Sequence, residues 1–307
     1  MARYLFLRLL WILPVALGVV TAVFFLIHLI PGDPIDLMLG ETAGVADRVH
    51  LRESLHLDEP ILKQYGHFIL RLATGDLGES FSMKKPVMDI LLSRYPATLL
   101  LAISAMIIAI ALAIPLGIFS GLKKGGIGDQ TILLGSLFGV SMPNFCLGPL
   151  LIILFSLQLN WLPVSGKEGV LSLILPALTL GIGMAAILIR MTRASVLDTM
   201  EKTFMVTARA KGLPERVVIF KHLFRNSLIP LITVLGLQFG ALLTGSIITE
   251  TIFSWPGLGR LMIQAIFSRD YPLVQGCVLA VAFTYLLVNL LVDILYVITD
   301  PRVRYET

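Results

Sequence analysis

Charge is the scarcest property of this sequence. Its 307 residues include 24 Lys or Arg and 20 Asp or Glu, or 14% of the chain, whereas soluble proteins carry about 25%. Six segments of at least 21 residues contain no charged residue: 9–32, 95–122, 130–166, 169–189, 226–249 and 271–292. A helix needs about 20 mostly apolar residues to cross the hydrocarbon core of a bilayer. The composition therefore excludes a soluble globular protein and predicts an all-α polytopic membrane protein with six transmembrane helices.

Cysteines and catalytic motifs are also lacking. The two cysteines, Cys146 and Cys277, lie inside apolar segments, so neither a disulfide framework nor a cysteine zinc site is expected. The sequence contains no G-x-x-x-x-G-K-[ST] phosphate loop and no H-E-x-x-H motif. We expect no catalytic residue, no metal site and no bound nucleotide in this chain.

Charge inside the predicted spans is almost absent. Only Glu250 and Asp293 come close, and both lie at the ends of apolar segments. Ionisable residues within spans are the usual mark of proton or ion coupling, so a proton-coupled secondary transporter is the less favoured alternative. No histidine lies in the middle of an apolar segment, which also disfavours an intramembrane Ser–His hydrolase.

The basic residues predict the orientation in the membrane. With the N-terminus in the cytoplasm, the inside segments carry 14 Lys or Arg and the short outside segments carry three, as the positive-inside rule requires. The net charge of +4 is thereby explained without nucleic acid. Segment 130–166 is long enough for two spans, but two would place the eight basic residues of 190–225 outside. We therefore predict one span near 131–157, kinked at Pro143, and both termini in the cytoplasm.

These patterns divide the chain into four parts. Residues 1–32 form the N-terminal segment and first span, and 33–94 form an extracytoplasmic loop. Residues 95–298 form a five-helix core that contains a cytoplasmic loop at 190–225, and 299–307 form a cytoplasmic tail.

The outer loop contains a predicted amphipathic helix. Asp58 is placed to cap it, Pro60 lies in its first turn, and Gly75 ends it. Its apolar residues share one face: Ile61, Leu62, Tyr65, Phe68, Ile69 and Leu72. Three roles stay open at this point: a helix lying on the membrane surface, a cover on the protein's own bundle, or a docking surface for a partner.

The cytoplasmic loop is predicted to be a helix–Gly–helix hairpin. Residues 203–211 are compatible with a helix, and Gly212 suits the C′ position that follows one. Pro214 and Glu215 suit the first turn of a second helix. Several apolar residues are expected to need a partner surface or lipid headgroups to cover them: Phe204, Met205, Val206, Val217, Val218, Ile219 and Phe220.

The fifth predicted span is rich in glycine. Gly236 and Gly240 form a small-xxx-small face that allows close helix approach, and Gly245 follows. We expect these glycines and Glu250 to serve packing within the chain or against a partner, or to line a pathway. For Glu250, structural pairing is favoured over contact with substrate.

The cytoplasmic loop resembles the coupling loop of binding-protein-dependent ABC importer permeases. Val206-Thr207-Ala208 stands where that family has E-A-A, and Gly212 stands at its glycine. The family's I-x-L-P ending is absent, since residues 222–225 read His-Leu-Phe-Arg. The T-A-R-A-K-G run of residues 207–212 is typical of the subgroup that imports di- and oligopeptides, glutathione or nickel.

The resemblance extends over nearly the whole chain. Further segments similar to that subgroup are Pro31-Gly32-Asp33-Pro34, Leu57-Asp58-Glu59-Pro60, Gly75-Asp76-Leu77-Gly78, Ser141-Met142-Pro143-Asn144-Phe145, Trp161-Leu162-Pro163, Phe253-Ser254-Trp255-Pro256-Gly257-Leu258-Gly259-Arg260, Arg269-Asp270-Tyr271-Pro272 and Asp300-Pro301-Arg302. The outer loop at 158–170 is shorter than in some dipeptide permeases, which leaves the substrate open.

The resemblance implies a type I ABC importer permease in the bacterial cytoplasmic (inner) membrane. Such a subunit pairs with a second homologous permease, two cytoplasmic ATPases that hold ATP and Mg²⁺, and an extracytoplasmic substrate-binding protein. The residues that the resemblance assigns to ATPase coupling are Thr203, Val206, Thr207, Ala208, Arg209, Ala210, Lys211 and Gly212. The implied function is to form half of the pathway for di- or oligopeptides, with glutathione or a nickel complex as alternatives.

Overall fold

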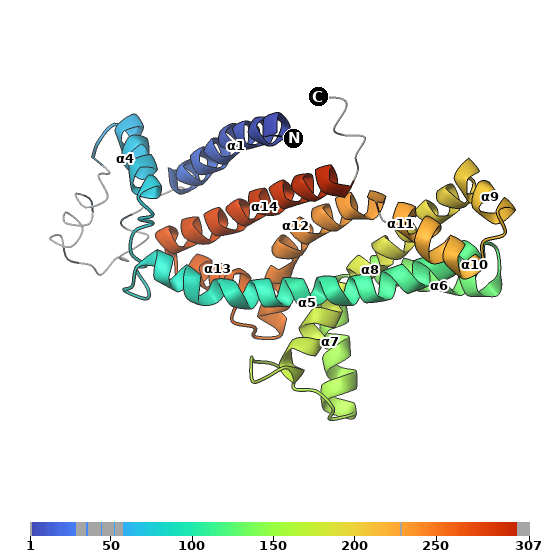
Figure 1. Ribbon diagram of the computed structural model, residues 1–307. Helices are drawn as coiled ribbons and strands as arrows, with labels where there is room; N and C mark the ends of the chain where they lie inside the picture. The colour runs from blue at the N-terminus through green and yellow to red at the C-terminus, as the bar shows by residue number, and fades with distance from the viewer. Residues whose placement is uncertain are drawn as a thin grey trace.

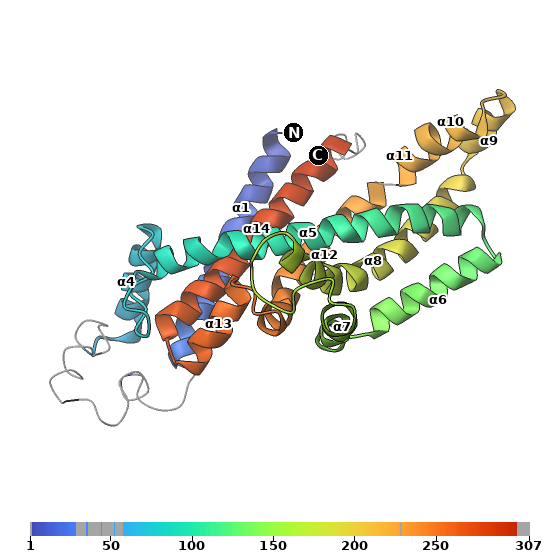
Figure 2. The same ribbon diagram turned by 90° about the horizontal axis from the view of Figure 1, so that it is seen from below.

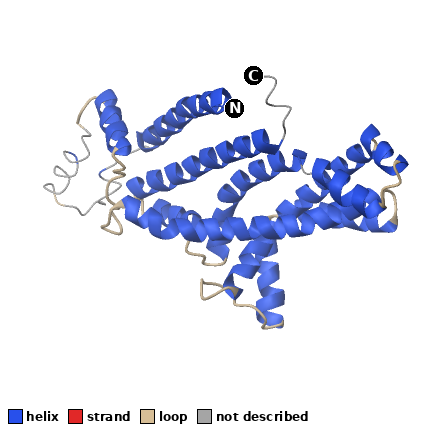
Figure 3. Ribbon diagram, viewed as in Figure 1, coloured by secondary structure: helices blue, strands red, loops and turns tan. Residues whose placement is uncertain are grey.

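The computed structural model describes residues 2–28, 35, 44, 52, 58–227 and 229–299, and these are overwhelmingly helical (Figures 1 and 3). The helices are α1 (Ala2–His28), α4 (Ile61–Ala73), α5 (Val87–Leu122), α6 (Ile127–Ser141), α7 (Asn144–Leu151), the π-helical segment η1 (Ile152–Gln158), α8 (Leu171–Met200), α9 (Thr203–Ala210), α10 (Glu215–Val217), the π-helical segment η2 (Val218–Leu223), α11 (Phe224–Ser227), α12 (Ile229–Ile252), α13 (Leu258–Phe267) and α14 (Tyr271–Thr299). The segments Pro31-Gly32-Asp33-Pro34 and Asp300-Pro301-Arg302, residue Leu57 and the predicted tail after Thr299 lie outside the described residues.

Several helices have the length and composition of membrane spans. In the described residues, α5, α8 and α14 each contain a sufficient apolar stretch, and the bent pairs α6–α7–η1 and α12 bring the number to as many as five. The apolar part of α1, Leu10–Phe25, is shorter. A polytopic helical membrane fold is thus confirmed, while the count of six spans and the side of each terminus stay predictions.

Small residues bring α5 and α8 together along most of their length. Ala105, Ala109 and Ala113 of α5 share a buried core with Ala185 and Leu188 of α8. Alanine and glycine allow helix backbones to approach closely in a membrane. The two helices consequently run side by side towards the same end of the molecule (Figures 1 and 2).

The segment predicted as one kinked span is broken more sharply. Helix α6 ends at Ser141, and the axis of α7 and η1 lies at 105° to that of α6. Because a proline disfavours the helical conformation of the residue before it, Met142 is extended and Pro143 begins a new direction. Helix α7 therefore projects away from α5 rather than continuing along the bundle (Figure 1).

The outer amphipathic helix packs on its own bundle. The Tyr65 hydroxyl lies 2.6 Å from Thr21 Oγ1 of α1, and the rings of Tyr65 and Phe68 contact Phe24. Leu70, on the opposite side, is 66% exposed. Leu62 is predicted to belong to the apolar face but is 80% exposed, so the packed face is narrower than predicted. The predicted apolar face thus covers α1 and α14 in part, and the exposed side remains available to lipid or a partner.

The two ends of α4 were predicted with unequal success. Gly75, at φ +78°, follows the helix as expected, and the Asp76 N–H donates to Arg71 O at 2.9 Å in the pattern of a Schellman cap. Asp58 does not cap the helix. Pro60 itself occupies the N-cap position, and Asp58 lies 3.6 Å from Arg52 instead.

Asp270 fastens the outer loop to the start of α14. Its buried carboxylate accepts hydrogen bonds from Ser80 Oγ (2.6 Å) and from Ser82 N (3.0 Å) and Oγ (2.7 Å), and Leu273 N lies 3.3 Å away. Burial raises the pKa of Asp270, but these hydrogen bonds outweigh burial and hold its pKa below the ordinary value. The anchored loop leads directly into α5 at Val87, so the helix begins eight residues before the predicted core at residue 95.

Glycines in α12 serve packing within the chain. A Cβ at Gly236 would overlap the Val292 side chain, and a Cβ at Gly240 would overlap the Tyr285 ring, both on α14. At these two positions α12 and α14 approach each other closely, as a small-xxx-small face allows. Gly245 also lies on α12, but its surroundings are outside the described part of the structure.

We expect Gly240→Ala to reduce the free energy of unfolding by about 1–3 kcal/mol, because the added methyl group overpacks a filled contact. The matched control is Gly135→Ala on α6, where a Cβ meets nothing within 4 Å. Thermal unfolding of the detergent-solubilised protein compares the two variants. A second change, Tyr285→Ala, should recover part of the loss; equal behaviour of the Gly240 and Gly135 variants would contradict the packing assignment.

Candidate coupling site

The loop after α8 forms the predicted hairpin, here called the coupling hairpin (residues 203–227). Helix α9 ends at Ala210, and Gly212 occupies the C′ position with φ +71°. Its N–H donates to Arg209 O at 2.9 Å. Pro214 is the N-cap of the second helical arm rather than part of its first turn. Since α8 continues to Met200, the hairpin begins at Thr203, thirteen residues after the start of the predicted loop at 190.

The inner face of the hairpin packs against the ends of α5 and α8. Met205, Ala208, Val218 and Leu223 form one buried cluster with Val196 of α8. Met205 and Val218 were expected to be exposed and are 1% and 0% exposed. That expectation was wrong because the two arms cover each other and the ends of the long helices.

The outer face of the hairpin remains uncovered. Phe204, Val206 and Phe220 are 36%, 62% and 72% exposed. Of the residues assigned to coupling from the sequence, all but one are exposed: Thr203, Val206, Thr207, Arg209, Ala210, Lys211 and Gly212. Ala208 is the exception, since it is buried in the inner cluster. Helices α9 and α10 stand at one end of the molecule (Figure 2), so the exposed apolar and basic residues of the hairpin lie at that end.

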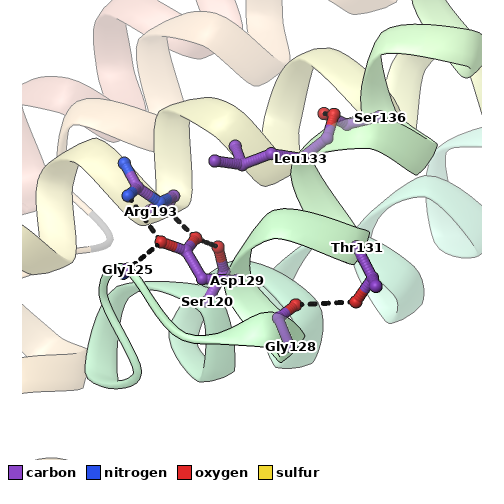
Figure 4. Close-up of polar contacts among 8 residues, drawn as sticks. All are labelled: Ser120, Gly125, Gly128, Asp129, Thr131, Leu133, Ser136 and Arg193. Atoms are coloured by element: carbon purple, nitrogen blue, oxygen red, sulfur yellow. Dashed lines mark hydrogen bonds and ion pairs between the residues drawn. The ribbon is translucent and has the colours of Figure 1, made fainter.

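An ion pair between a partly exposed arginine and a buried carboxylate joins α8 to the start of α6 (Figure 4). Arg193 of α8 donates from Nε to Asp129 Oδ1 at 2.7 Å and from Nη2 to Oδ2 at 2.8 Å. Ser120 Oγ and the Gly125 N–H also donate to the Asp129 carboxylate. Sequence reasoning missed this pair. Its one visible signal is that Asp129 immediately precedes a charge-free segment, which does not identify a partner 64 residues away.

Glu250 forms a second polar centre, towards the other end of α5. Its fully buried carboxylate accepts from Thr98 Oγ1 at 2.8 Å and from Arg260 N at 3.0 Å. Thr98 in turn accepts from Leu258 N at 2.7 Å. The carboxylate therefore lies at the N-terminus of α13, where unpaired N–H groups and the helix dipole favour an anion. In this geometry the Glu250 carboxylate is paired with groups of its own chain.

The segment between Glu250 and Arg260 is folded around that carboxylate. Trp255 is buried and donates from Nε1 to Ala97 O at 2.8 Å. A Cβ on Gly257 would overlap the Glu250 carboxylate, and one on Gly259 would overlap the Ile247 backbone. The tryptophan and glycines of this motif thus join α5, α12 and α13.

A cavity near the coupling end lies between α6 and α8. It has a volume of about 470 Å³ and is lined by Gln130, Leu133, Leu134, Leu137 and Arg190. Another, of about 340 Å³, is almost wholly apolar and lies between α4, α5 and α14. Within the described residues, no group of three His, Cys, Asp or Glu side chains is placed to hold a metal ion.

Comparison with known proteins relates the whole chain to one family. The model of the binding-protein-dependent transport system inner membrane component matches residues 113–305, and that of the N-terminal part of such a component matches residues 1–102. The glutathione transport system permease protein GsiC of Pectobacterium atrosepticum is 43% identical over 306 residues and that of Escherichia coli strain K12 is 41% identical, each covering 100% of both chains.

Solved structures show the same fold at low identity. A chain of the MetNI methionine ABC transporter in an inward-facing conformation aligns with a TM-score of 0.57 and 18% identity, over 71% of this chain and 100% of that chain. A chain of an amino acid ABC transporter aligns with a TM-score of 0.52 and 17% identity, over 70% and 94%. This chain belongs to the family of binding-protein-dependent transport system inner membrane components, as a multi-pass permease subunit of an ABC importer.

Proposed function

We propose that this permease forms half of the translocation pathway of an ATP-driven glutathione importer. The observation that carries the proposal is the match to glutathione permeases from end to end of the chain, at 43% and 41% identity. In the proposed complex a second homologous permease supplies the other half, and an extracytoplasmic binding protein delivers the substrate. Two cytoplasmic ATPases bind ATP and Mg²⁺, and this chain binds neither.

The coupling hairpin is the proposed contact with the ATPase. Its exposed apolar side chains, Phe204, Val206 and Phe220, need a covering surface outside the bilayer. We propose that residues 203–211 dock in a cleft of one ATPase and that closure of the ATPases on ATP rotates the hairpin. Gly212 sets the angle between its arms.

The substrate was first expected to be a di- or oligopeptide, on the resemblance alone. Glutathione is itself a tripeptide, so the same kind of importer suits both. The names of the full-length relatives favour glutathione. A nickel complex and other small peptides are the competing substrates.

Uptake by cells tests both substrate and energy source. A strain lacking this chain and the same strain with the chain restored are supplied with labelled glutathione, a labelled dipeptide or a nickel salt. We expect restored glutathione uptake that survives a protonophore but is lost when the phosphate-loop lysine of the partner ATPase is replaced. Uptake of only the dipeptide or nickel would overturn the substrate, and uptake that depends on the proton gradient but not on the ATPase would overturn the importer.

A further inference from the structure

The turn between α5 and α6 is held to α8 by a charged contact that the function above does not use. Asp129 in the first turn of α6 accepts hydrogen bonds from Nε and Nη2 of Arg193 (Figure 4). It also accepts from the Ser120 hydroxyl of α5 and from the Gly125 N–H of the turn itself. These four groups are called the Asp129 clamp. Asp129 is 2% exposed. The clamp therefore joins three helices at a single carboxylate.

The clamp is continuous with the base of the coupling hairpin. Arg193 lies one turn of α8 before Val196, whose fully buried side chain packs with Met205 and Ala208 of α9. A Cβ at Gly121 of α5 would overlap Val196. A displacement of α9 is thus transmitted through Val196 to the segment of α8 that carries Arg193.

The same contact borders the space between α6 and α8. Gln130, adjacent to Asp129, and Arg190, one turn from Arg193, line the cavity of about 470 Å³ there. Leu133 and Leu137 continue the α6 wall of that cavity. Any change in the angle between α6 and α8 alters the volume of this cavity. The Asp129 clamp fixes that angle at the end of the two helices that is nearer to the coupling hairpin.

Stability alone is a poor reason for such a pair. The Asp129 carboxylate is buried and the Arg193 side chain is 22% exposed, so the pair carries a desolvation penalty, chiefly at the carboxylate. Replacing a buried ion pair by apolar side chains of similar volume often leaves a protein equally stable. What the pair supplies is geometry, since a bidentate Arg–carboxylate contact holds its partners at one distance and one orientation. This favours a role in relative helix position.

We propose that Asp129 and Arg193 are positioning residues that make α6 move together with the coupling hairpin. The inference rests on the proposed docking of the hairpin to an ATPase. With the clamp intact, rotation of the hairpin carries α8 and α6 as one rigid unit. Without the clamp, the hairpin and α8 move but α6 does not move with them.

The test compares ion-pair removals in the assembled importer. Asp129→Leu with Arg193→Met removes the clamp while retaining volume. Arg8→Met with Asp293→Leu removes the 3.0 Å ion pair between α1 and α14 as a matched control. In proteoliposomes we measure the amount of ATPase that co-purifies, the rate of ATP hydrolysis and the amount of glutathione imported per ATP. The clamp variant should keep the wild-type amount of ATPase and the wild-type rate of ATP hydrolysis. Its import of glutathione per ATP should fall about threefold or more, a usual size for altered coupling. The control should keep all three quantities.

The outcomes separate this proposal from the function on which it rests. Import per ATP at the wild-type level in the clamp variant overturns the clamp's role and leaves the importer intact. If the double variant does not assemble, Arg193→Lys decides, because it keeps the charge and loses the fork. If the lysine variant imports as much glutathione per ATP as the wild type, the proposal is overturned. A fall of about threefold or more in that ratio supports it. If no ATPase co-purifies with the wild-type permease, hairpin docking fails and the clamp's role falls with it.

Discussion

A Gly212→Val variant is expected to insert into the membrane and to lose about tenfold or more of its substrate uptake. The position has φ +71°, a conformation that costs a β-branched residue about 1–3 kcal/mol. Nothing lies within 4 Å of a Cβ placed there, so the penalty comes from the backbone and not from a clash. The strain is relieved by changing the angle between α9 and the second arm, which misaligns the exposed face with its ATPase.

Gly212→Asn is the control, because asparagine tolerates the left-handed region better than other non-glycine residues. Uptake, substrate-stimulated ATP hydrolysis and the amount of permease in the membrane are measured for both variants. The asparagine variant should retain most of its uptake. Normal uptake and normal stimulated hydrolysis in the valine variant would refute the role assigned to the hairpin angle.

Glu250→Ala is expected to reduce the free energy of unfolding by about 3–5 kcal/mol, a large part of the stability of an ordinary protein. The change removes the acceptor for Thr98 Oγ1 and Arg260 N, which are left in a buried site. It also leaves the N-terminus of α13 without its anion. Thermal unfolding in detergent should show the loss, together with a lower yield of membrane-inserted protein.

Two variants make this result specific. Glu250→Gln keeps one carbonyl acceptor and the shape of the side chain, so its loss should be about half as large. Glu168→Ala removes an exposed carboxylate from an outer loop and should cost less than about 0.5 kcal/mol. If the alanine variant at 250 is as stable as the wild type while uptake is lost, Glu250 contacts substrate and the structural assignment is incorrect.

The helices and turns that depend on local sequence were predictable. The apolar face of α4, its end at Gly75 and the C′ role of Gly212 follow from periodicity and from the freedom of glycine at positive φ. The packing of Gly236 and Gly240 follows from their spacing of four. Membrane insertion follows from the charge-free segments, whose composition is independent of tertiary contacts.

The features that depend on long-range contacts were not predictable in the same way. The break at Pro143 was expected to be a kink within one span. Proline alone does not reveal that α7 packs against α8 and α12 in a new direction. The burial of Met205 and Val218 depends on the fold of the hairpin against α5 and α8. The pairing of Asp129 with Arg193 depends on helices that are distant in the sequence. Helix α13 is only ten residues long, too short to be recognised as a membrane span from its composition.

The length of α5 has a mechanical consequence. Its 36 residues span about 54 Å at 1.5 Å per residue, whereas the hydrocarbon core is about 30 Å thick. Roughly 24 Å of α5 therefore lies outside the hydrocarbon if the helix stands upright, and tilting the helix reduces this length. The charged residues of α5, Asp89 and Arg94, lie in its first eight residues, so about 12 Å of this length stands at the end away from the coupling hairpin. About 12 Å remains at the hairpin end, and a tilt of about 10° at the membrane boundary would move the hairpin by about 2 Å. A small angular change inside the bilayer is thus converted into a displacement of the coupling hairpin, and a displacement of the hairpin is converted into a tilt of α5.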